Sequence, residues 1–157
     1  MPMNAVLGYA RVSTTGQDLD AQLGALSMAG VDPARVFTDK LSGSAKTARP
    51  GLAAMLDYAR AVDTVVVTAI DRLGRSVVEV TRTIADLGQR SITLRALREG
   101  IDTATPTGRA VAAIMATLAE LELELGRERR AASRESRRAR QLSAAAHTLM
   151  RFGSDPG

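Results

Sequence analysis

The sequence predicts an α/β fold in which a small, mostly parallel sheet is covered by helices and followed by a long C-terminal helix. Short apolar runs alternate with segments of helical spacing along the first two thirds of the chain. The run TVVVTAI at residues 64–70 is β-branched and nearly continuous, as in a strand buried on both faces. After Gly100 an apolar stripe with helical spacing continues further than one small domain can cover.

Each element follows from its local pattern. The four apolar runs are predicted strands, at Ala5–Val12, Arg35–Thr38, Thr64–Ile70 and Ile92–Leu97. The segments between them are predicted helices, at Leu19–Ala29, Pro50–Val62 and Val77–Gln89. Because parallel sheets of this kind place their sites at the carboxyl ends of the strands, we expect functional residues directly after the apolar runs.

The long helix begins after a cap signal. Thr105 can cap it, and Pro106 suits its first position. Its apolar stripe consists of Val111, Ile114, Met115, Leu118, Leu121 and Leu125. The stripe predicts contact with a second copy of the chain, although it can also serve only to cap the sheet. We therefore expect a domain at residues 1–104, a helix at 105–140 and a disordered tail at 141–157.

Composition excludes several classes of function. The 157 residues contain no cysteine and one histidine, His147, which lies in the expected tail. Thiol catalysis is excluded, and neither a structural zinc site nor a Ser-His-Asp triad is expected. Aromatic residues make up 3%, too few for a platform that stacks single-stranded bases. No apolar stretch approaches the roughly 20 residues of a membrane span, so we expect a cytoplasmic protein with no membrane partner.

The net charge of +4 is unevenly distributed. Residues 1–126 carry 11 Arg and 2 Lys against 14 acidic residues, whereas residues 127–157 carry 8 Arg against 3. Seven arginines and two glutamates lie between Arg127 and Arg140, spread around the helix. This segment is either a solvated helical end or an arm along a nucleic-acid backbone. The predicted DNA-binding residues are Arg127, Arg130, Arg134, Arg137 and Arg138. The preference for arginine over lysine suits phosphate binding, and a high-GC codon bias gives the same preference.

Polar side chains follow the first predicted strand. Strand periodicity places Tyr9, Arg11 and Ser13 on one side, with Ser13 at the carboxyl end. A serine at this place is usually a turn or cap residue, and an arginine is usually part of a surface ion pair. An arginine inside an otherwise apolar first strand nevertheless requires a reason.

A second group follows the third predicted strand. Asp71 and Arg72 lie at its end, and Arg75 can share a face with Arg72 on a helical turn. Asp39 closes the second strand, and Arg49 precedes a helix start. One serine and several arginines suit phosphoryl transfer to a hydroxyl, because cations stabilise the charge on the non-bridging oxygens.

These residues resemble the serine site-specific recombinases, the resolvase/invertase family. The resemblance starts in the run Tyr9 to Gln17, YARVSTTGQ. It continues in order through FTDKLSGS (37–44), RPGL (49–52), DRLGRS (71–76), EGIDT (99–103) and AELELEL (119–125). It covers about residues 5–138, and several separated motifs in order make it highly specific.

The resemblance implies site-specific DNA recombination. Ser13 would attack a DNA phosphodiester, form a 5′-phosphoserine link and release a 3′-hydroxyl, with no metal or other cofactor. Its catalytic residues would be Ser13, Arg11, Asp71, Arg72 and Arg75, and its supporting residues Gln17, Asp39 and Arg49. The partners it implies are double-stranded DNA and further copies of the chain, as a homodimer that forms a tetramer during strand exchange. The resemblance therefore also implies a nucleoid-associated protein.

The sequence also departs from the family pattern. A helix-turn-helix module normally follows the long helix, but the 17 residues after Arg140 are too few for one and do not resemble it. We therefore expect a truncated chain, a frameshifted product or a natural catalytic domain without its own DNA reader. Leu123 replaces a frequent arginine, and Gly126 costs the helix about 1 kcal/mol relative to Ala.

Two other functions remain open from the sequence. The chain can be a catalytically idle dimerisation module that interferes with full-length relatives. It can also be a general α/β phosphate-binding protein, although the presence of Ser13 with Asp71 and the arginines disfavours that interpretation.

Overall fold

The computed structural model describes residues 4–12, 16–40 and 49–153. The chain divides into two compact units, Met1–Ala119 and Glu120–Gly157, which are treated separately below. Among the described segments, none of the helices combines the length and apolarity needed to cross a membrane.

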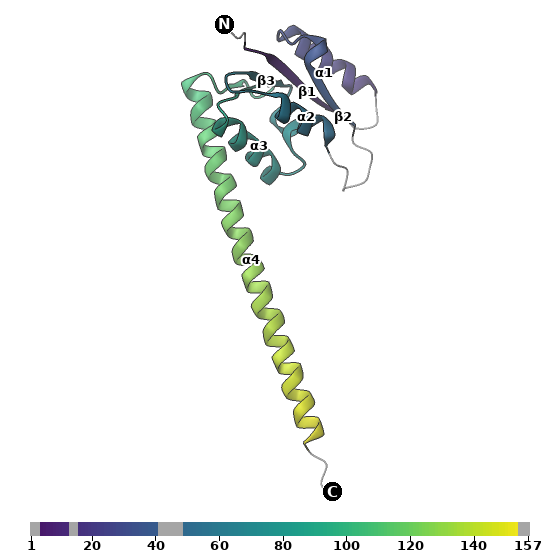
Figure 1. Ribbon diagram of the computed structural model, residues 1–157, viewed down its shortest axis with the longest axis vertical. Coiled ribbons are helices and arrows are strands. Elements are labelled where there is room, and N and C mark those ends of the chain that lie inside the picture. Colours follow the sequence, from purple (N-terminus) through teal and green to yellow (C-terminus); the bar gives the residue numbers. More distant parts are fainter. Residues whose placement is uncertain (1–3, 13–15, 41–48, 154–157) are drawn as a thin grey trace. The chain divides into compact units, whose positions relative to one another are not determined.

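The first unit is built on a five-stranded sheet (Figure 1). Its strands are β1 (Val6–Val12), β2 (Val36–Lys40), β3 (Thr64–Val67), β4 (Thr93–Ala96) and β5 (Ile101–Asp102). The spatial order is β2-β1-β3-β4-β5. Neighbours are parallel except β5, which runs antiparallel to β4. The predicted mostly parallel sheet is confirmed. The two-residue strand β5 was not predicted, because no apolar run marks it in the sequence.

Helices cover both faces of this sheet. They are α1 (Gly16–Met28), α2 (Pro50–Tyr58), α3 (Val77–Gln89) and the start of α4 (Pro106–Phe152). On one face, Leu26 of α1 packs with Ala10 and Val66. On the other face, a larger core joins α2 and α3 to the strands, and Tyr9 belongs to it. Tyr9 and its neighbour Ala10 therefore lie on opposite faces of the sheet, as the alternation of side chains along a strand predicts.

The third strand is shorter than predicted. Val65, Val66 and Val67 are fully buried, as expected from their continuous apolar run. The strand nevertheless ends at Val67, and Ile70–Leu73 form a short 3-10 helix, η2. The reason lies in the register, because the β1–β3 ladder ends at the pair Tyr9–Val67.

Beyond that pair, β1 continues alongside β2 alone, as far as Val12 opposite Lys40. The helix that follows β1, α1, covers one face of the sheet, whereas the helix that follows β3 and η2, α3, covers the other face. In open parallel sheets, this switch point is where a crevice forms and ligands bind. The fold places Arg11 on one side of it and η2 on the other.

The start of α4 agrees with the predicted cap. The Thr105 hydroxyl accepts a hydrogen bond of 3.1 Å from the Gly108 N–H. The apolar stripe of this helix divides between two surroundings. Met115 packs against the core, whereas Ile114 and Leu118 are 61% and 43% exposed. The first turns of α4 thus cap the sheet and still present apolar side chains to solvent.

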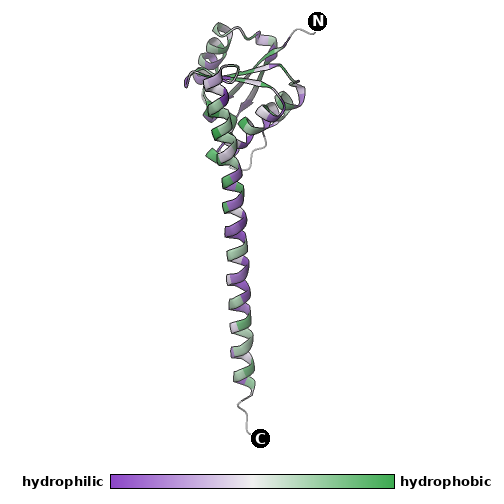
Figure 2. Ribbon diagram, turned by 90° about the vertical axis from the view of Figure 1, so that its left-hand side faces the viewer, coloured by the Kyte–Doolittle hydropathy of each residue, from purple (hydrophilic) through white to green (hydrophobic). Residues whose placement is uncertain are grey.

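The second unit contains the remainder of α4, which ends at Phe152. The helix runs past Arg140, where we expected it to end, and residues 141–152 are helical instead of disordered. Alanines 144–146 are followed by further good helix formers, and no glycine or proline interrupts them before Gly153. The middle of α4 is strongly hydrophilic, as Figure 2 shows.

Candidate functional site

Three of the predicted site residues meet at the carboxyl end of β1. Arg11 is the second-last residue of that strand, Arg72 lies on η2 after β3, and Arg49 is the N-cap of α2. Ser13, the predicted nucleophile, lies outside the described residues. Gln17 is the second residue of α1, and its side chain is also outside them.

Arg11 is the centre of this group. Its Nη1 donates a hydrogen bond of 2.8 Å to the Gly74 carbonyl, which belongs to the segment after η2. Its Nε is buried and has no hydrogen-bond partner among the residues that the structure describes. Burial lowers the pKa of Arg11, and the positive charges of Arg49 and Arg72 lower it further. The guanidinium groups of Arg49 and Arg72 therefore both lie close enough to Arg11 to repel its positive charge.

Arg72 contacts the same strand end from η2. Its Nη1 donates to the Arg11 carbonyl at 3.0 Å and lies 3.8 Å from Asp18 of α1. Its Nε lies 3.6 Å from Asp71, but the contact is not a hydrogen bond. Asp71 is itself largely exposed and also pairs with Arg98 at 3.5 Å. Asp71 thus lies on the exposed side of the site, next to the more buried side chain of Arg72.

Asp39 positions the chain segment that carries Arg49, the third arginine of the site. Its buried carboxylate accepts hydrogen bonds from the Tyr9 hydroxyl at 2.8 Å and from the N–H groups of Gly51 and Leu52 at 2.7 and 2.9 Å. A carboxylate at the first N–H groups of a helix satisfies them and matches the helix dipole. This arrangement fixes the start of α2, and with it the backbone of Arg49. The Arg49 side chain is only 10% exposed.

Tyr9 is neutral in this environment. Burial raises its pKa well above the ordinary value of 10.0, and the hydrogen bond to Asp39 and the charge of that carboxylate raise it further. The phenol therefore acts as a hydrogen-bond donor to Asp39. Its role in the structure is to connect the central strand with the start of α2.

Arg75 does not share a helical face with Arg72, so this prediction is wrong. The 3-10 helix ends at Leu73, and Gly74 is fully extended with φ −166° and ψ 167°. The extended residue turns the chain before Ser76 caps α3. The Arg75 N–H donates 2.7 Å to Glu79 Oε2.

One buried residue of the site escaped the sequence analysis. Gln22 of α1 is 4% exposed, and its Oε1 accepts from the Arg11 N–H at 3.2 Å. Its Nε2 donates to the Arg11 carbonyl at 2.9 Å and to Asp18 at 3.0 Å. The signal was present, because Gln22 lies at helical spacing between the inward-facing Leu19 and Leu26.

The five predicted DNA-binding arginines lie on the second unit, and all are exposed. Their spacings of three, four, three and one residues place them on one face of α4. Arg129 and Arg140 point elsewhere on the same helix, by the same geometry. The arginines are therefore less evenly spread around the helix than the sequence suggested.

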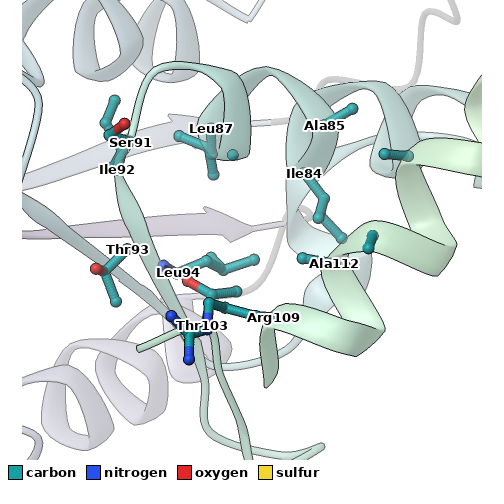
Figure 3. A pocket seen from close by; sticks show the side chains of 13 residues that line it. Ile84, Ala85, Leu87, Ser91, Ile92, Thr93, Leu94, Thr103, Arg109 and Ala112 are labelled. Atoms are coloured by element: carbon teal, nitrogen blue, oxygen red, sulfur yellow. Dashed lines mark hydrogen bonds between the residues drawn. The ribbon is translucent and has the colours of Figure 1, made fainter. Parts of the chain in front are cut away.

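A separate apolar pocket of about 330 Å³ lies between α3, β4 and the first turns of α4. Ile84 and Ala112 approach each other inside it, and Arg109 lies at its border (Figure 3). It shares no residue with the arginine group. Within the described part of the chain, no three carboxylate or imidazole groups gather closely enough to hold a metal ion.

The arginine group has the properties of an anion site. Within residues 4–12, 16–40 and 49–153, no hydrogen-bond partner is present for three buried atoms, Arg11 Nε, Arg49 Nη2 and Arg72 Nε. Unpaired buried N–H groups and neighbouring positive charges both cost free energy of folding. An anion with several oxygens, such as a phosphodiester, offsets both costs, because guanidinium groups bind such oxygens with paired hydrogen bonds.

Comparison with known proteins agrees with this chemistry. Residues 6–142 match the model of the family described as the resolvase N-terminal domain. The chain is 44% identical over 124 residues to the serine recombinase gin of Escherichia phage Mu, which covers 79% of this chain and 63% of gin. It thus spans less than two thirds of that relative's length.

Two further relatives extend the comparison. The DNA-invertase hin of Salmonella typhimurium is 42% identical over 135 residues, which covers 86% of this chain and 70% of hin. Among solved structures, the N-terminal catalytic domain of TP901-1 integrase superposes with a TM-score of 0.62 at 31% identity. That superposition covers 78% of this chain and 98% of the integrase domain.

Proposed function

The chain belongs to the resolvase N-terminal domain family, and on that premise we propose that it performs site-specific DNA recombination by cleaving DNA with Ser13. The observation that carries the proposal is the convergence of Arg11, Arg49 and Arg72 at the end of β1, with buried N–H groups for which the described part of the chain offers no acceptor. Ser13 follows β1 directly, because that strand ends at Val12.

In the proposed reaction, the Ser13 oxygen attacks a DNA phosphorus and displaces the 3′-oxygen. A 5′-phosphoserine bond forms, and the serine proton passes to the site or to solvent. The leaving 3′-oxygen takes up a proton from the same source and becomes a hydroxyl. One phosphoester bond replaces another, so the energy for religation is retained. Reverse attack by an exchanged 3′-hydroxyl then restores the DNA and frees Ser13.

Each arginine of the group has a proposed task. Arg11 and Arg72 bind the non-bridging oxygens, on which negative charge develops in the transition state. Arg49, held beside them at the start of α2, supports the same charge. Asp71 and Arg75 complete the catalytic set by their place in the family motif, and Asp39 and Gln17 support it.

The domain and the long helix predicted from the sequence have different tasks in this proposal. Residues 1–104 carry the chemistry, and residues 105–140 dimerise and reach along DNA. The exposed apolar side chains of α4, Leu121 and Leu125 among them, suit contact with a second copy, and a tetramer forms during strand exchange. The arginine face of α4 binds the phosphate backbone. Such contacts position a protein on DNA without specifying sequence.

The proposal is tested by covalent adduct formation. The protein is incubated with a pool of nicked duplexes whose central segments are randomised, since a nick traps the cleaved intermediate. We expect a band that survives detergent, disappears with protease, and carries its nucleotide on Ser13 by mass spectrometry. Ser13→Ala abolishes the band, whereas Ser27→Ala, at an exposed serine on α1, retains it.

Two results would overturn the assignment of Ser13 as the nucleophile. An adduct that persists in Ser13→Ala shows that another group attacks the phosphorus. An adduct absent from the intact protein removes the proposed activity. In that case, inhibition of a full-length relative by mixing tests the alternative of an interfering dimerisation module.

A further inference from the structure

Glu79 of α3 joins two segments of the arginine site through a single oxygen. Its Oε2 accepts a hydrogen bond of 2.7 Å from the Arg75 N–H and lies 3.5 Å from Arg49 Nη2. Arg75 precedes α3, whereas Arg49 comes from the start of α2. The carboxylate therefore connects parts of the site that are distant in sequence.

The base of Glu79 is firmly held. The Ser76 hydroxyl accepts a hydrogen bond of 3.2 Å from its N–H and caps α3. A Cβ added at Gly74 would lie 2.7 Å from the Cβ of Glu79, so the two backbones approach as closely as a glycine permits. The carbonyl of Gly74 in turn holds Arg11. Glu79 is thus fixed relative to the central guanidinium of the site.

Arg49 needs such a counter-charge. Its side chain is nearly buried, and its positive charge lowers the pKa of Arg11. The two positive charges therefore repel each other, which tends to move the Arg49 side chain away from Arg11. Among the described residues, Glu79 is the acidic side chain that forms an ion pair with Arg49. Their contact is not a hydrogen bond, so Arg49 Nη2 keeps its N–H groups for another acceptor.

We propose that Glu79 is a positioning residue, which holds the Arg49 guanidinium beside Arg11 so that both meet the same phosphate. The inference rests on the proposed function and adds a residue outside the set that the sequence motifs indicate. Glu79 touches no reacting atom, and it acts through the place that it gives to Arg49.

Replacing Glu79 by a neutral residue of similar shape separates its positioning role from the general effect of net charge on DNA binding. Glu79→Gln keeps an oxygen that can accept from the Arg75 N–H but removes the charge that holds Arg49. Asp86→Asn is the matched control, because Asp86 lies on the same helix and pairs at 3.6 Å with Arg90, away from the site. Both variants lose one negative charge, so both bind DNA equally well or more tightly than the original protein.

We expect Glu79→Gln to lower the rate of adduct formation at saturating nicked duplex about tenfold, since small displacements of a positioned group slow catalysis strongly. The duplex concentration that gives half of the maximal rate does not rise. Asp86→Asn leaves the rate unchanged. A rate in Glu79→Gln that equals or exceeds that of the original protein would overturn the inference.

A double substitution checks that Glu79 acts through Arg49. In an Arg49→Lys background, Glu79→Gln causes no further loss of rate, because the geometry that it maintains is already gone. A further tenfold loss there contradicts the inference.

A measurement without DNA separates this inference from the proposed function. The Arg49 Nε–H signal in a nitrogen-15 spectrum is assigned by its loss in Arg49→Lys, and its exchange with water is followed. We expect exchange about tenfold faster in Glu79→Gln than in the original protein, and unchanged in Asp86→Asn. Unchanged exchange in Glu79→Gln overturns the role of Glu79 even if the protein forms adducts. Faster exchange supports that role even if it forms none.

Discussion

The Tyr9 hydroxyl donates a hydrogen bond of 2.8 Å to the carboxylate of Asp39, and both groups are buried. Tyr9 lies on the central strand β1, and Asp39 lies near the end of β2 with two N–H groups of α2 bound to it. The pair therefore determines where α2 begins and where Arg49 emerges. It links the core of the sheet to the arginine group at the carboxyl end of β1.

We expect Asp39→Ala to lower the free energy of unfolding by about 3 kcal/mol, because it removes the helix cap and leaves the Tyr9 hydroxyl buried without an acceptor. Tyr9→Phe removes one donor of three and costs about 1 kcal/mol. Urea unfolding of both variants measures the difference. Equal losses would show that the N–H groups of α2 gain little from Asp39.

The raised pKa of Tyr9 predicts how stability depends on alkaline pH. Below the ordinary value of 10.0 the tyrosine is neutral in both states, so its contribution is fully present. Above it, the unfolded chain releases the proton while the folded chain retains it, and stability falls as pH rises toward the folded pKa.

Tyr58→Phe leaves Tyr9 as the single tyrosine, which makes this measurable. We expect its phenolate absorbance to stay low through pH 10 and to rise together with the loss of helical circular dichroism. Phenolate formation in the folded protein near pH 10 would contradict the burial and hydrogen bond described for Tyr9.

We expect Arg72→Ala to slow adduct formation about 100-fold, since it removes a cation from the charge that develops on the phosphate. The free energy of unfolding changes little, because the described contacts of this side chain are one hydrogen bond, to the Arg11 carbonyl, and two long ion pairs with Asp18 and Asp71. Arg82→Ala, at an exposed position on α3, is the control for both measurements. A normal adduct rate in Arg72→Ala would remove this residue from the site.

The arginine face of α4 predicts a particular salt dependence. Replacing Arg130 and Arg134 by glutamine reduces the slope of log affinity against log salt by about 2 for a short duplex of arbitrary sequence. Replacing Arg129 and Arg140, which lie off this face, changes the slope less. Equal changes from the two pairs would mean that DNA contacts the helix from more than one side.

The backbone conformation of Val62, which lies outside the site, suggests a substitution that stabilises the protein. Its φ of 70° is unfavourable for a β-branched residue, and its side chain is 58% exposed. Val62→Gly relieves this strain, and we expect a gain of about 1 kcal/mol after the greater freedom of the unfolded chain is counted. Ala61→Gly, at a residue without a positive φ, should destabilise the protein instead. Thermal unfolding compares the two.

The sequence identified most of the fold because its elements have strong local signals. The Thr64–Val67 strand is a β-branched run, and α3 at Val77–Gln89 has the predicted bounds. The ends of elements were less predictable. β3 stops at Val67 because its partner β1 leaves the ladder there, and α4 continues to Phe152 because its residues favour helix without an apolar stripe.

For the site, the sequence indicated the strand ends and the residues that belong to the family pattern. It could not indicate how those residues are held. Gln22 and Glu79 gain their importance from contacts with Arg11 and Arg49, which lie 11 and 30 positions away along the chain. Such pairs leave no local pattern.

By itself, the sequence determined the α/β class, the family and the set of arginines near strand ends, because periodicity and ordered motifs are properties of neighbouring residues. Only the tertiary structure decided that Arg49 and Arg72 lie beside Arg11, that Asp39 binds the start of α2, and that Glu79 lies 3.5 Å from Arg49. Charges that repel in isolation are brought together by the packing of β1, η2 and α2. The free energy of folding of those elements offsets the repulsion between the positive charges of the arginines.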